Sequence, residues 1–242
     1  MEHQNKREEL SFFNNFVKAA SEYDVFDNNG KHKLINLFQN EIISVRGKCL
    51  LDIGCGTGVL TSQFSKLGAK AIGVDISAIS IATARKQNQA TYLVCDAESL
   101  CFKDNAFDIV TFCAVLHHFP NLEKVIWEAF RVLKTGGKIF SFDPHRANLV
   151  MFLYRDRYSP LRSTKGITKN ERLLSKKDLE VQFKKYSDEY KIFCASGITY
   201  SYVEISLMRP ILKVYNFLEK MFDKIWLSKY FGSWIFGVAK KP

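Results

Sequence analysis

The chain has 242 residues, 47% of them hydrophobic, and a formal net charge of +10. This length and composition predict a single α/β domain spanning residues 1–242. The first nine residues lack the apolar segment of a signal peptide, and no apolar run is long enough to span a bilayer, so we expect neither a secreted nor a membrane-spanning protein. We expect a cytoplasmic protein that is at most peripheral to a membrane.

The net charge and the cysteine content indicate which partners, metals and cellular compartment to expect. A positive net charge is compatible with binding to nucleic acid, to an anionic membrane or to an acidic substrate. The alternative is an ordinary solvated surface without such a partner. The six cysteines show no metal-binding spacing such as Cys-x-x-Cys, so we predict no metal. Most of them fall in or beside predicted buried strands, where a free cysteine behaves as a small hydrophobe, and this favours a reducing compartment.

Residues 1–46 read as a helical cap. Apolar residues recur with a helical period over residues 10–20 and again over residues 34–42, and Asn28-Asn29-Gly30 is expected to separate the two helices. Phe12, Phe13 and Tyr23 are candidates to line an active site, with core packing as the alternative.

A glycine-rich turn follows the first predicted strand, which runs from Cys49 to Ile53. Glycines stand at 54, 56 and 58, and a helix is expected from Val59. Such a turn exposes backbone N–H groups to a ligand at a helix N-terminus. A dinucleotide fingerprint would need glycine at position 59, so the spacing favours S-adenosylmethionine over NAD.

Two acidic residues end the next two predicted strands. Asp75 follows an apolar strand that ends at Val74, and a carboxylate there can accept both ribose hydroxyls of an adenosine. Asp75 could instead cap the helix expected over residues 78–86, but Ser77 can fill that role. Asp96 follows the third strand, where an isolated Asp is usually only a turn former.

Four side chains suited to proton transfer follow the fourth and fifth predicted strands. The strand at residues 107–113 leads into His117 and His118, and the strand at residues 138–142 leads into Asp143 and His145. Histidine titrates near neutral pH and suits an oxygen, carbon or nitrogen acceptor. The alternatives are that one histidine of the pair only orders its loop, and that Asp143 is a turn former or the residue that orients His145.

The core at residues 47–145 alternates strand and helix, which predicts a parallel sheet with ligands at the carboxyl ends of its strands. Residues 146–242 are expected to form the acceptor side. A helix is predicted at residues 174–186 with Ser175 as N-cap, and strands at residues 190–194 and 233–240. Tyr154, Tyr158, Tyr200 and Tyr202 are candidates for an aromatic wall.

A helical insertion at about residues 196–232 separates the last two strands. Its apolar stripe is expected to pack on the domain's own core or on a second subunit. The alternatives are that it docks on a membrane or forms a lid over an apolar acceptor. Glu219 and Asp223 lie beside the stripe and argue against a strongly membrane-seeking face. The stripe consists of Ile211, Val214, Tyr215, Leu218, Phe222, Ile225 and Trp226.

The stretch "LLDIGCGTG" and the later blocks "FDIV", "LHHF" and "LKTGGKIF" resemble the class I S-adenosylmethionine-dependent methyltransferases, in particular the ubiquinone and menaquinone C-methyltransferase subgroup. The resemblance covers about residues 45–145. It implies a Rossmann-like, seven-stranded, mostly parallel sheet whose last strand is antiparallel, with N-terminal helices folded over the cofactor and acceptor.

The resemblance also assigns cofactor-binding roles. It implies that Ile76 packs on the adenine, that Asp96 accepts a hydrogen bond from the adenine amino group and that Ala97 contributes its backbone N–H. We expect Cys113 to turn its carbonyl toward the methionine amine. The methionine half is expected on Asp52, Gly54, Gly56 and Gly58.

The sequence therefore predicts an S-adenosylmethionine-dependent methyltransferase acting on a small molecule, such as a metabolite, sugar or lipid-like intermediate, as a monomer or homodimer. RNA or protein methylation is the alternative that the net charge favours, although the Asn/Asp-Pro-Pro-Tyr/Phe motif and an appended RNA-binding module are missing, so nucleic acid is not the expected partner. A noncatalytic scaffold that retains the fold is the alternative of another class. An NAD-dependent oxidoreductase is disfavoured by Val59.

Overall fold

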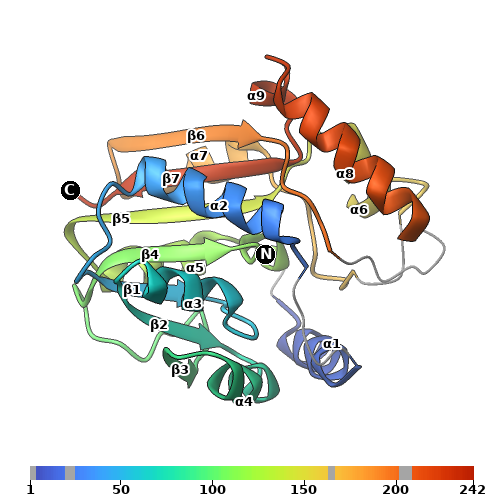
Figure 1. The fold of residues 1–242 in the computed structure, drawn as a ribbon. Helices are drawn as coiled ribbons and strands as arrows, with labels where there is room; N and C mark the ends of the chain where they lie inside the picture. The colour runs from blue at the N-terminus through green and yellow to red at the C-terminus, as the bar shows by residue number, and fades with distance from the viewer. Residues whose placement is uncertain (1–3, 20–24, 163–166, 202–208) are drawn as a thin grey trace.

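A twisted sheet of seven strands forms the centre of the molecule (Figure 1). The computed structural model describes residues 4–19, 25–162, 167–201 and 209–242, so Tyr23 and Tyr202 lie outside the described part. The strand order is β3-β2-β1-β4-β5-β7-β6. Neighbours from β3 to β5 pair parallel, and β7 pairs antiparallel with both β5 and β6. The strands are β1 (Cys49–Ile53), β2 (Lys70–Asp75), β3 (Thr91–Val94), β4 (Phe107–Cys113), β5 (Leu133–Pro144), β6 (Glu189–Ala195) and β7 (Trp234–Lys240).

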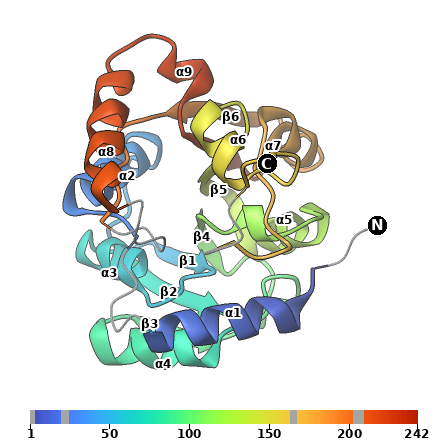
Figure 2. The ribbon, with the colours of Figure 1, turned by 90° about the vertical axis from the view of Figure 1, so that its right-hand side faces the viewer.

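Helices cover both faces of the sheet. Three of them, α2, α3 and α4, lie on one face, and α5 and α7 lie on the other (Figure 2). This arrangement confirms the predicted mostly parallel, Rossmann-like fold class. The helices of these layers are α2 (Asn28–Glu41), α3 (Val59–Lys66), α4 (Ala78–Gln87), α5 (Glu123–Val132) and α7 (Lys176–Phe183).

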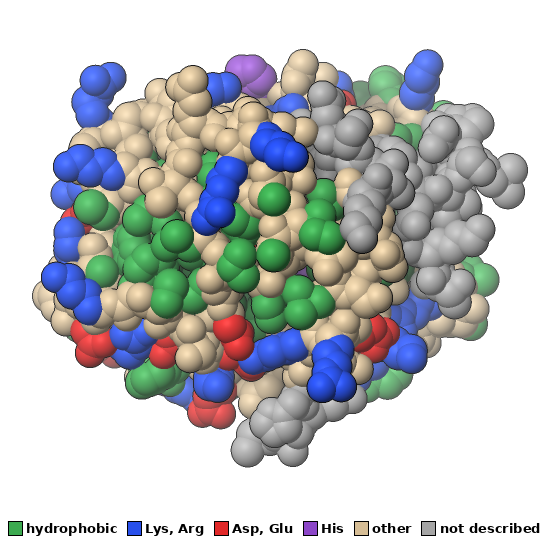
Figure 3. All heavy atoms as spheres, turned by 90° about the horizontal axis from the view of Figure 1, so that it is seen from below, with side chains coloured by type: hydrophobic (Ala, Val, Ile, Leu, Met, Phe, Trp, Pro, Cys, Tyr) green, Lys and Arg blue, Asp and Glu red, His purple; other side chains and the backbone are tan. Residues whose placement is uncertain are grey.

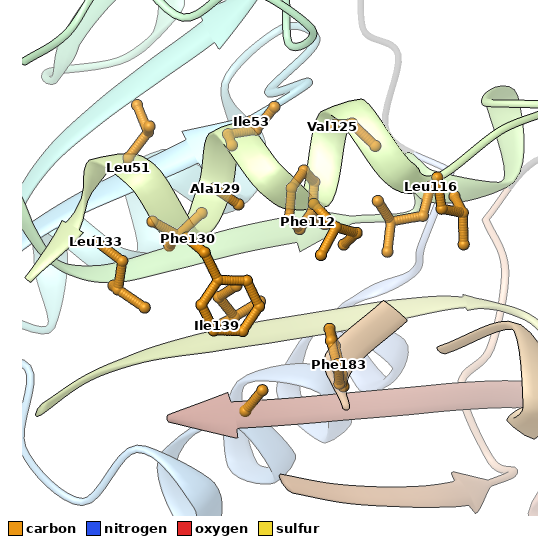
Figure 4. Close-up of a cluster of buried hydrophobic side chains, with 14 of the residues drawn as sticks. Leu51, Ile53, Phe112, Leu116, Val125, Ala129, Phe130, Leu133, Ile139 and Phe183 are labelled. Carbon is orange, nitrogen blue, oxygen red and sulfur yellow. The ribbon is translucent and has the colours of Figure 1, made fainter. Parts of the chain in front are cut away.

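Alternation along the strands divides the core between the two faces. Leu50 packs with Phe38 of α2 on one side, whereas Leu51 and Ile53 pack beneath α5 on the other. Figure 4 shows Phe112 among the side chains gathered under α5. Because Phe112 is fully buried, its truncation to alanine is expected to cost about 3–5 kcal/mol.

Local signals explain several helix boundaries. Ser77 accepts a hydrogen bond from the Ser80 N–H at the start of α4, as predicted, and Ser175 forms a capping box with Asp178 at the start of α7. The separator predicted at residues 28–30 is wrong. These residues form the first turn of α2, because the Asp27 carboxylate accepts a hydrogen bond from the Gly30 N–H at 2.8 Å.

Four further helices are described outside the two layers: α1 (Lys6–Ala19), α6 (Leu149–Arg155), α8 (Arg209–Asp223) and α9 (Ser228–Phe231). Both α8 and α9 belong to the predicted insertion between β6 and β7, whereas α6 was not predicted. Figure 2 looks onto the carboxyl ends of the parallel strands and shows α1, α6 and α8 arranged around them. None of the helices in the described ranges is long and apolar enough to cross a membrane.

Candidate functional site

The glycine turn after β1 places the three glycines in different roles. All three have positive φ angles, of 70°, 53° and 80° at Gly54, Gly56 and Gly58. A Cβ on Gly56 would meet no atom within 4 Å, whereas a Cβ on Gly58 would lie 2.6 Å from the Tyr92 ring. Gly56 therefore leaves open space for a ligand. Gly58 instead begins α3 and lets Tyr92 approach the backbone.

Asp75 holds the glycine turn in place from the end of β2. Its Oδ2 accepts a hydrogen bond from the Gly56 N–H at 2.9 Å, and its Oδ1 accepts one from the Ser77 N–H at 2.8 Å. Burial raises the pKa of the Asp75 carboxyl, and these two N–H groups oppose that rise. Each carboxylate oxygen has a second lone pair, so both remain able to accept a ligand hydroxyl.

Asp52 lies beneath the same turn, at the end of β1. Its two oxygens accept hydrogen bonds from the hydroxyls of Thr61 at 2.6 Å and Thr111 at 2.8 Å. Burial raises the pKa of Asp52 to about 6, because desolvation outweighs these hydrogen bonds. A ligand cation placed beside this carboxyl would favour its ionised form.

Asp96 lies at the end of β3 and is joined to the N-terminal helix. Its Oδ2 lies 2.5 Å from the Lys6 Nζ of α1, and the same ammonium lies 2.7 Å from a Glu98 oxygen. Its Oδ1 accepts a hydrogen bond from the Glu98 N–H at 2.9 Å. This ion pair ties α1 to the loop on which the resemblance places the adenine.

A cavity of about 250 Å³ connects the predicted cofactor residues with the predicted histidines. Its wall comes from the loops after β1 to β5, from α1 and from the segment before α7. Most predicted site residues belong to the wall, whereas Gly58, Asp143 and His145 do not. The predicted residues in the wall are Asp52, Gly54, Gly56, Asp75, Ile76, Asp96, Ala97, Cys113, His117 and His118.

His117 and Asp143 form a buried pair at one end of the cavity. His117 Nδ1 lies 2.8 Å from Asp143 Oδ1, which also accepts the His117 backbone N–H at 3.0 Å. Burial lowers the pKa of His117 well below its usual value and raises the pKa of Asp143 to about 8. His117 is therefore neutral at neutral pH, and Asp143 acts on the cavity only through this ring.

His118 faces two carboxylates that the sequence did not indicate. Its Nδ1 lies 3.3 Å from a Glu9 oxygen of α1 and 3.9 Å from a Glu171 oxygen. Burial acts against the charged imidazole, but these two carboxylates raise the pKa of His118 above its usual value. Glu171 also lies 2.5 Å from the Arg155 guanidinium of α6. Glu9, Glu171 and Arg155 all line the cavity, yet no local motif marks them because they come from three separate segments.

His145 does not share this site, contrary to the prediction that it could act there with Asp143. Its Nδ1 lies 3.0 Å from the Gly232 carbonyl oxygen, and its Nε2 lies 3.9 Å from Cys194 Sγ. Asp143 contacts His117 instead. His145 follows the last residue of β5, and its backbone N–H donates a hydrogen bond to the Ser233 carbonyl at 3.0 Å, so its ring lies among the residues around Gly232 and Cys194.

The cluster also contains donor atoms of the kind that bind metals. Ligand atoms of His117, His118 and Glu171 lie within 4.8 Å of one another. The Arg155 guanidinium already neutralises Glu171 and would lie close to a cation bound there. A cation in this cluster would therefore have to compete with that guanidinium for Glu171.

Aromatic side chains form much of the remaining wall. Phe12 and Phe13 of α1, Tyr200 and Trp234 line the cavity. Tyr158 instead stands 69% exposed, with the Arg146 guanidinium over its ring. Of the predicted tyrosines that the structure describes, Tyr200 lines the cavity, whereas Tyr154 and Tyr158 do not.

The loop after β4 carries a strained residue. Ala114 lines the cavity with a φ of 57°, and its N–H donates a hydrogen bond to the Phe142 carbonyl at 2.9 Å. A non-glycine residue rarely adopts this conformation, and such strain concentrates at functional sites. The neighbouring Val115 side chain closes on Gly54, where an added Cβ would lie 2.4 Å from it.

Comparison with known proteins agrees with this geometry. Residues 51–141 match the family model described as a methyltransferase domain. These residues form a methyltransferase domain. The chain is 31% identical to a ubiquinone biosynthesis O-methyltransferase of Coxiella burnetii over 160 residues. This alignment covers 61% of the chain and 66% of the relative. A ubiquinone/menaquinone biosynthesis C-methyltransferase of Pseudomonas aeruginosa is 34% identical over 160 residues, covering 60% and 62%.

The methyltransferase domain also shares its fold with solved structures. An S-adenosylmethionine-dependent methyltransferase of Thermotoga maritima superposes with a TM-score of 0.65 over 96% of this chain and 99% of the other, at 18% identity. At that identity the likeness concerns the fold alone. The chain spans just under two thirds of the length of the two curated relatives above.

Proposed function

We propose that this protein transfers the methyl group of S-adenosylmethionine to a small-molecule acceptor. The observation that carries the proposal is that Gly56, Asp75 and His117 line one and the same cavity. A cofactor seated on the glycine turn would therefore share one cavity with an acceptor that reaches the histidine.

The residues of the turn fit this cofactor. The position of a Cβ on Gly56 is open, Asp75 retains lone pairs for a ribose, and Asp52 is a buried carboxyl able to meet an ammonium group. When bound, S-adenosylmethionine supplies an activated methyl group with its own leaving group. The protein's own contribution is to orient the acceptor, exclude water and take up a proton where the acceptor has one to lose.

His117 is the residue that we assign to proton removal. It is a neutral imidazole, and Asp143, once ionised above its pKa of about 8, holds the proton on Nδ1 and leaves Nε2 as the basic atom. This is the arrangement in which a buried carboxylate sets the tautomer of a histidine base. His118, whose pKa is raised, is better suited to hold the acceptor through its charge.

The cavity favours an acceptor with an apolar body and one polar, protic end. Phe12, Phe13 and Trp234 offer ring surfaces, whereas His118, Glu171 and Arg155 gather at one place in the wall. A volume of about 250 Å³ has to hold parts of both reactants, which argues against a folded macromolecule as acceptor. We propose a phenol, enol or similar small hydroxylated compound. The two relatives, whose names place them in quinone biosynthesis, support this class.

Methylation of RNA is less well supported than this. Figure 3 shows Lys and Arg side chains scattered among apolar and acidic ones on the face seen from below, without a continuous basic track. Binding of a nucleic-acid backbone favours such a track. Protein methylation would require a peptide side chain to enter the same cavity.

The noncatalytic and NAD-dependent alternatives make different demands on the same turn. A noncatalytic scaffold would be free to fill the space above Gly56, which stays open here. An NAD site would place a pyrophosphate on the α3 N-terminus, where Val59 is the first helical residue. We also place the protein in the cytoplasm, since all six cysteines are free and a reducing compartment keeps them so.

Calorimetric titration with S-adenosylmethionine, S-adenosylhomocysteine and NAD tests the cofactor directly. We expect micromolar binding of both adenosyl compounds and none of NAD. Asp75→Asn should weaken the adenosyl ligands at least tenfold, while Asp104→Asn, at an exposed position of a loop, should leave them unchanged. If neither adenosyl ligand binds although circular dichroism shows an intact fold, the noncatalytic scaffold becomes the better account. Methyl transfer to a panel of phenols then tests the acceptor.

A further inference from the structure

The outward side of α8 and α9 carries eight exposed apolar side chains, which we term the α8–α9 face. Phe217 is 62% exposed and Trp226 is 68% exposed. Single exposed apolar residues are ordinary on a protein surface, but a row of them on one side of a helix marks a contact surface. The face consists of Val214, Phe217, Leu218, Met221, Ile225, Trp226, Tyr230 and Phe231.

Lysines border this row on one side. Lys213 and Lys220 are exposed and lie about two turns apart on one flank of α8, and the exposed Lys224 follows directly after the last residue of the helix. Lys229 is exposed on α9. The outward side of the insertion thus combines apolar surface with positive charge.

The tertiary structure removes both carboxylates of the segment from this side. Glu219 is only 5% exposed and accepts a hydrogen bond from the Ser233 hydroxyl at 2.7 Å. Asp223 pairs with Lys33 of α2 at 2.6 Å. These are the only acidic residues between positions 209 and 231. The sequence-based argument that they weaken a membrane-seeking face is therefore wrong.

We propose that the α8–α9 face docks this protein on an anionic lipid surface. An amphipathic helix with apolar residues on one side and lysines at its border lies in the membrane interface, and acidic headgroups attract the lysines. A second copy of the chain fits less well, because a two-fold contact through this face would bring its lysines against those of the partner.

The inward side of α8 connects the docking face to the cavity. Asn216 Nδ2 donates a hydrogen bond to the Tyr200 carbonyl at 2.8 Å, and Asn216 Oδ1 accepts the Tyr200 N–H at 3.0 Å. Tyr200 lines the cavity. If the proposed function holds, docking would bring the acceptor end of the molecule close to a lipid-dissolved substrate. The docking itself does not depend on that function.

Vesicle binding with Trp226 as the reporter tests the proposal. Trp127 is half-exposed on α5 and Trp234 is buried, so a Trp127→Phe background leaves Trp226 as the exposed indole. The vesicles are phosphatidylcholine alone, or phosphatidylcholine with about one third phosphatidylglycerol, each with and without brominated acyl chains. We expect binding to the anionic vesicles, with quenching of Trp226 by the bromolipid. Phosphatidylcholine alone should bind far more weakly.

Two charge-reversed variants of equal net charge separate docking from general electrostatics. Lys213→Glu/Lys220→Glu/Lys224→Glu should lower partitioning by at least about 10²-fold, because losing about 1 kcal/mol per lysine already gives that factor and the new glutamates are repelled by the anionic headgroups. Lys66→Glu/Lys86→Glu/Lys103→Glu changes three exposed lysines elsewhere and should retain most of the binding. Equal losses in both variants, or binding without quenching of Trp226, would overturn the proposal. So would a dimer in sedimentation that Phe217→Glu dissociates, because a second copy would then cover the face.

Discussion

His117 Nδ1 lies 2.8 Å from Asp143 Oδ1, although 26 residues separate them in the chain. Asp143 ends up there because β5 runs parallel to β4, so the loops after both strands open at the same edge of the sheet. The histidine receives its orientation from a carboxylate that the cavity itself does not reach.

Replacement of Asp143 by asparagine tests this orienting role. We expect Asp143→Asn to lower kcat on the order of 10²–10⁴-fold with little change in KM, because the acceptor does not touch Asp143. His145→Asn is the matched control and should keep most of the turnover, since His145 contacts Gly232 and Cys194 instead. Steady-state kinetics with saturating cofactor measures both variants. Full activity of Asp143→Asn would contradict the assignment of His117 as the base.

The same pair predicts a pH dependence of the rate. Burial raises the pKa of Asp143 to about 8, so below that pH the carboxyl holds a proton of its own. Loss of this proton lets Asp143 hold the proton on His117 Nδ1, which leaves Nε2 free to accept one. We therefore expect kcat to rise as the pH passes through about 8, and the rise to disappear in Asp143→Asn. A wild-type profile that is flat from pH 6 to about 9 would contradict the assignment.

Cofactor affinity should titrate at a lower pH. Burial raises the pKa of Asp52 to about 6, and an ammonium group on the ligand prefers the ionised carboxylate. The affinity for S-adenosylmethionine is therefore expected to increase as the pH rises through about 6. Adenosine lacks the methionine half and serves as the control ligand, whose affinity should stay level there. If calorimetry shows the same pH dependence of affinity for both ligands, Asp52 does not bind the methionine end.

Gly56 and Gly58 should respond differently to alanine. Gly58→Ala combines a positive φ with a Cβ 2.6 Å from Tyr92, and we expect a loss of about 2–4 kcal/mol in the free energy of unfolding. Gly56→Ala meets open space and should cost about 1 kcal/mol, while its methyl group weakens cofactor binding. Urea denaturation and calorimetry on both variants make the comparison. Equal destabilisation with unchanged affinity would show that the open space is not a ligand site.

Glu219 predicts a pH dependence of stability. Burial raises its pKa in the folded protein, so the folded state holds the proton more tightly than the unfolded chain. The free energy of unfolding should consequently fall as the pH rises above the ordinary glutamate range, and Glu219→Gln should abolish that fall. Urea midpoints at pH 5 and about pH 8 provide the measurement, with Glu123→Gln at an exposed position as control. A wild-type slope that persists in Glu219→Gln would assign it to another group.

The sequence by itself determined the alternation of strands and helices in the core, the glycine turn and the acids that follow the second and third apolar strands, because these features are local. A strand that runs into glycines and a helix is encoded within about ten residues, and period-two alternation is visible in the letters. Ser77 could be named as the cap of α4 on the same local grounds, which left Asp75 available to the turn.

Only the tertiary structure decided which distant groups meet. Glu9 and Glu171 join His118 from two segments far apart in the chain, and no periodicity encodes a contact of that kind. The partner of Asp143 was likewise set by the parallel pairing of β4 and β5. For the insertion, the sequence predicted an amphipathic helix. The charge of the outward side of that helix was determined by folding, which buries Glu219 and pairs Asp223 with Lys33. Contacts between distant segments follow from packing of the whole domain, which no single stretch of sequence specifies.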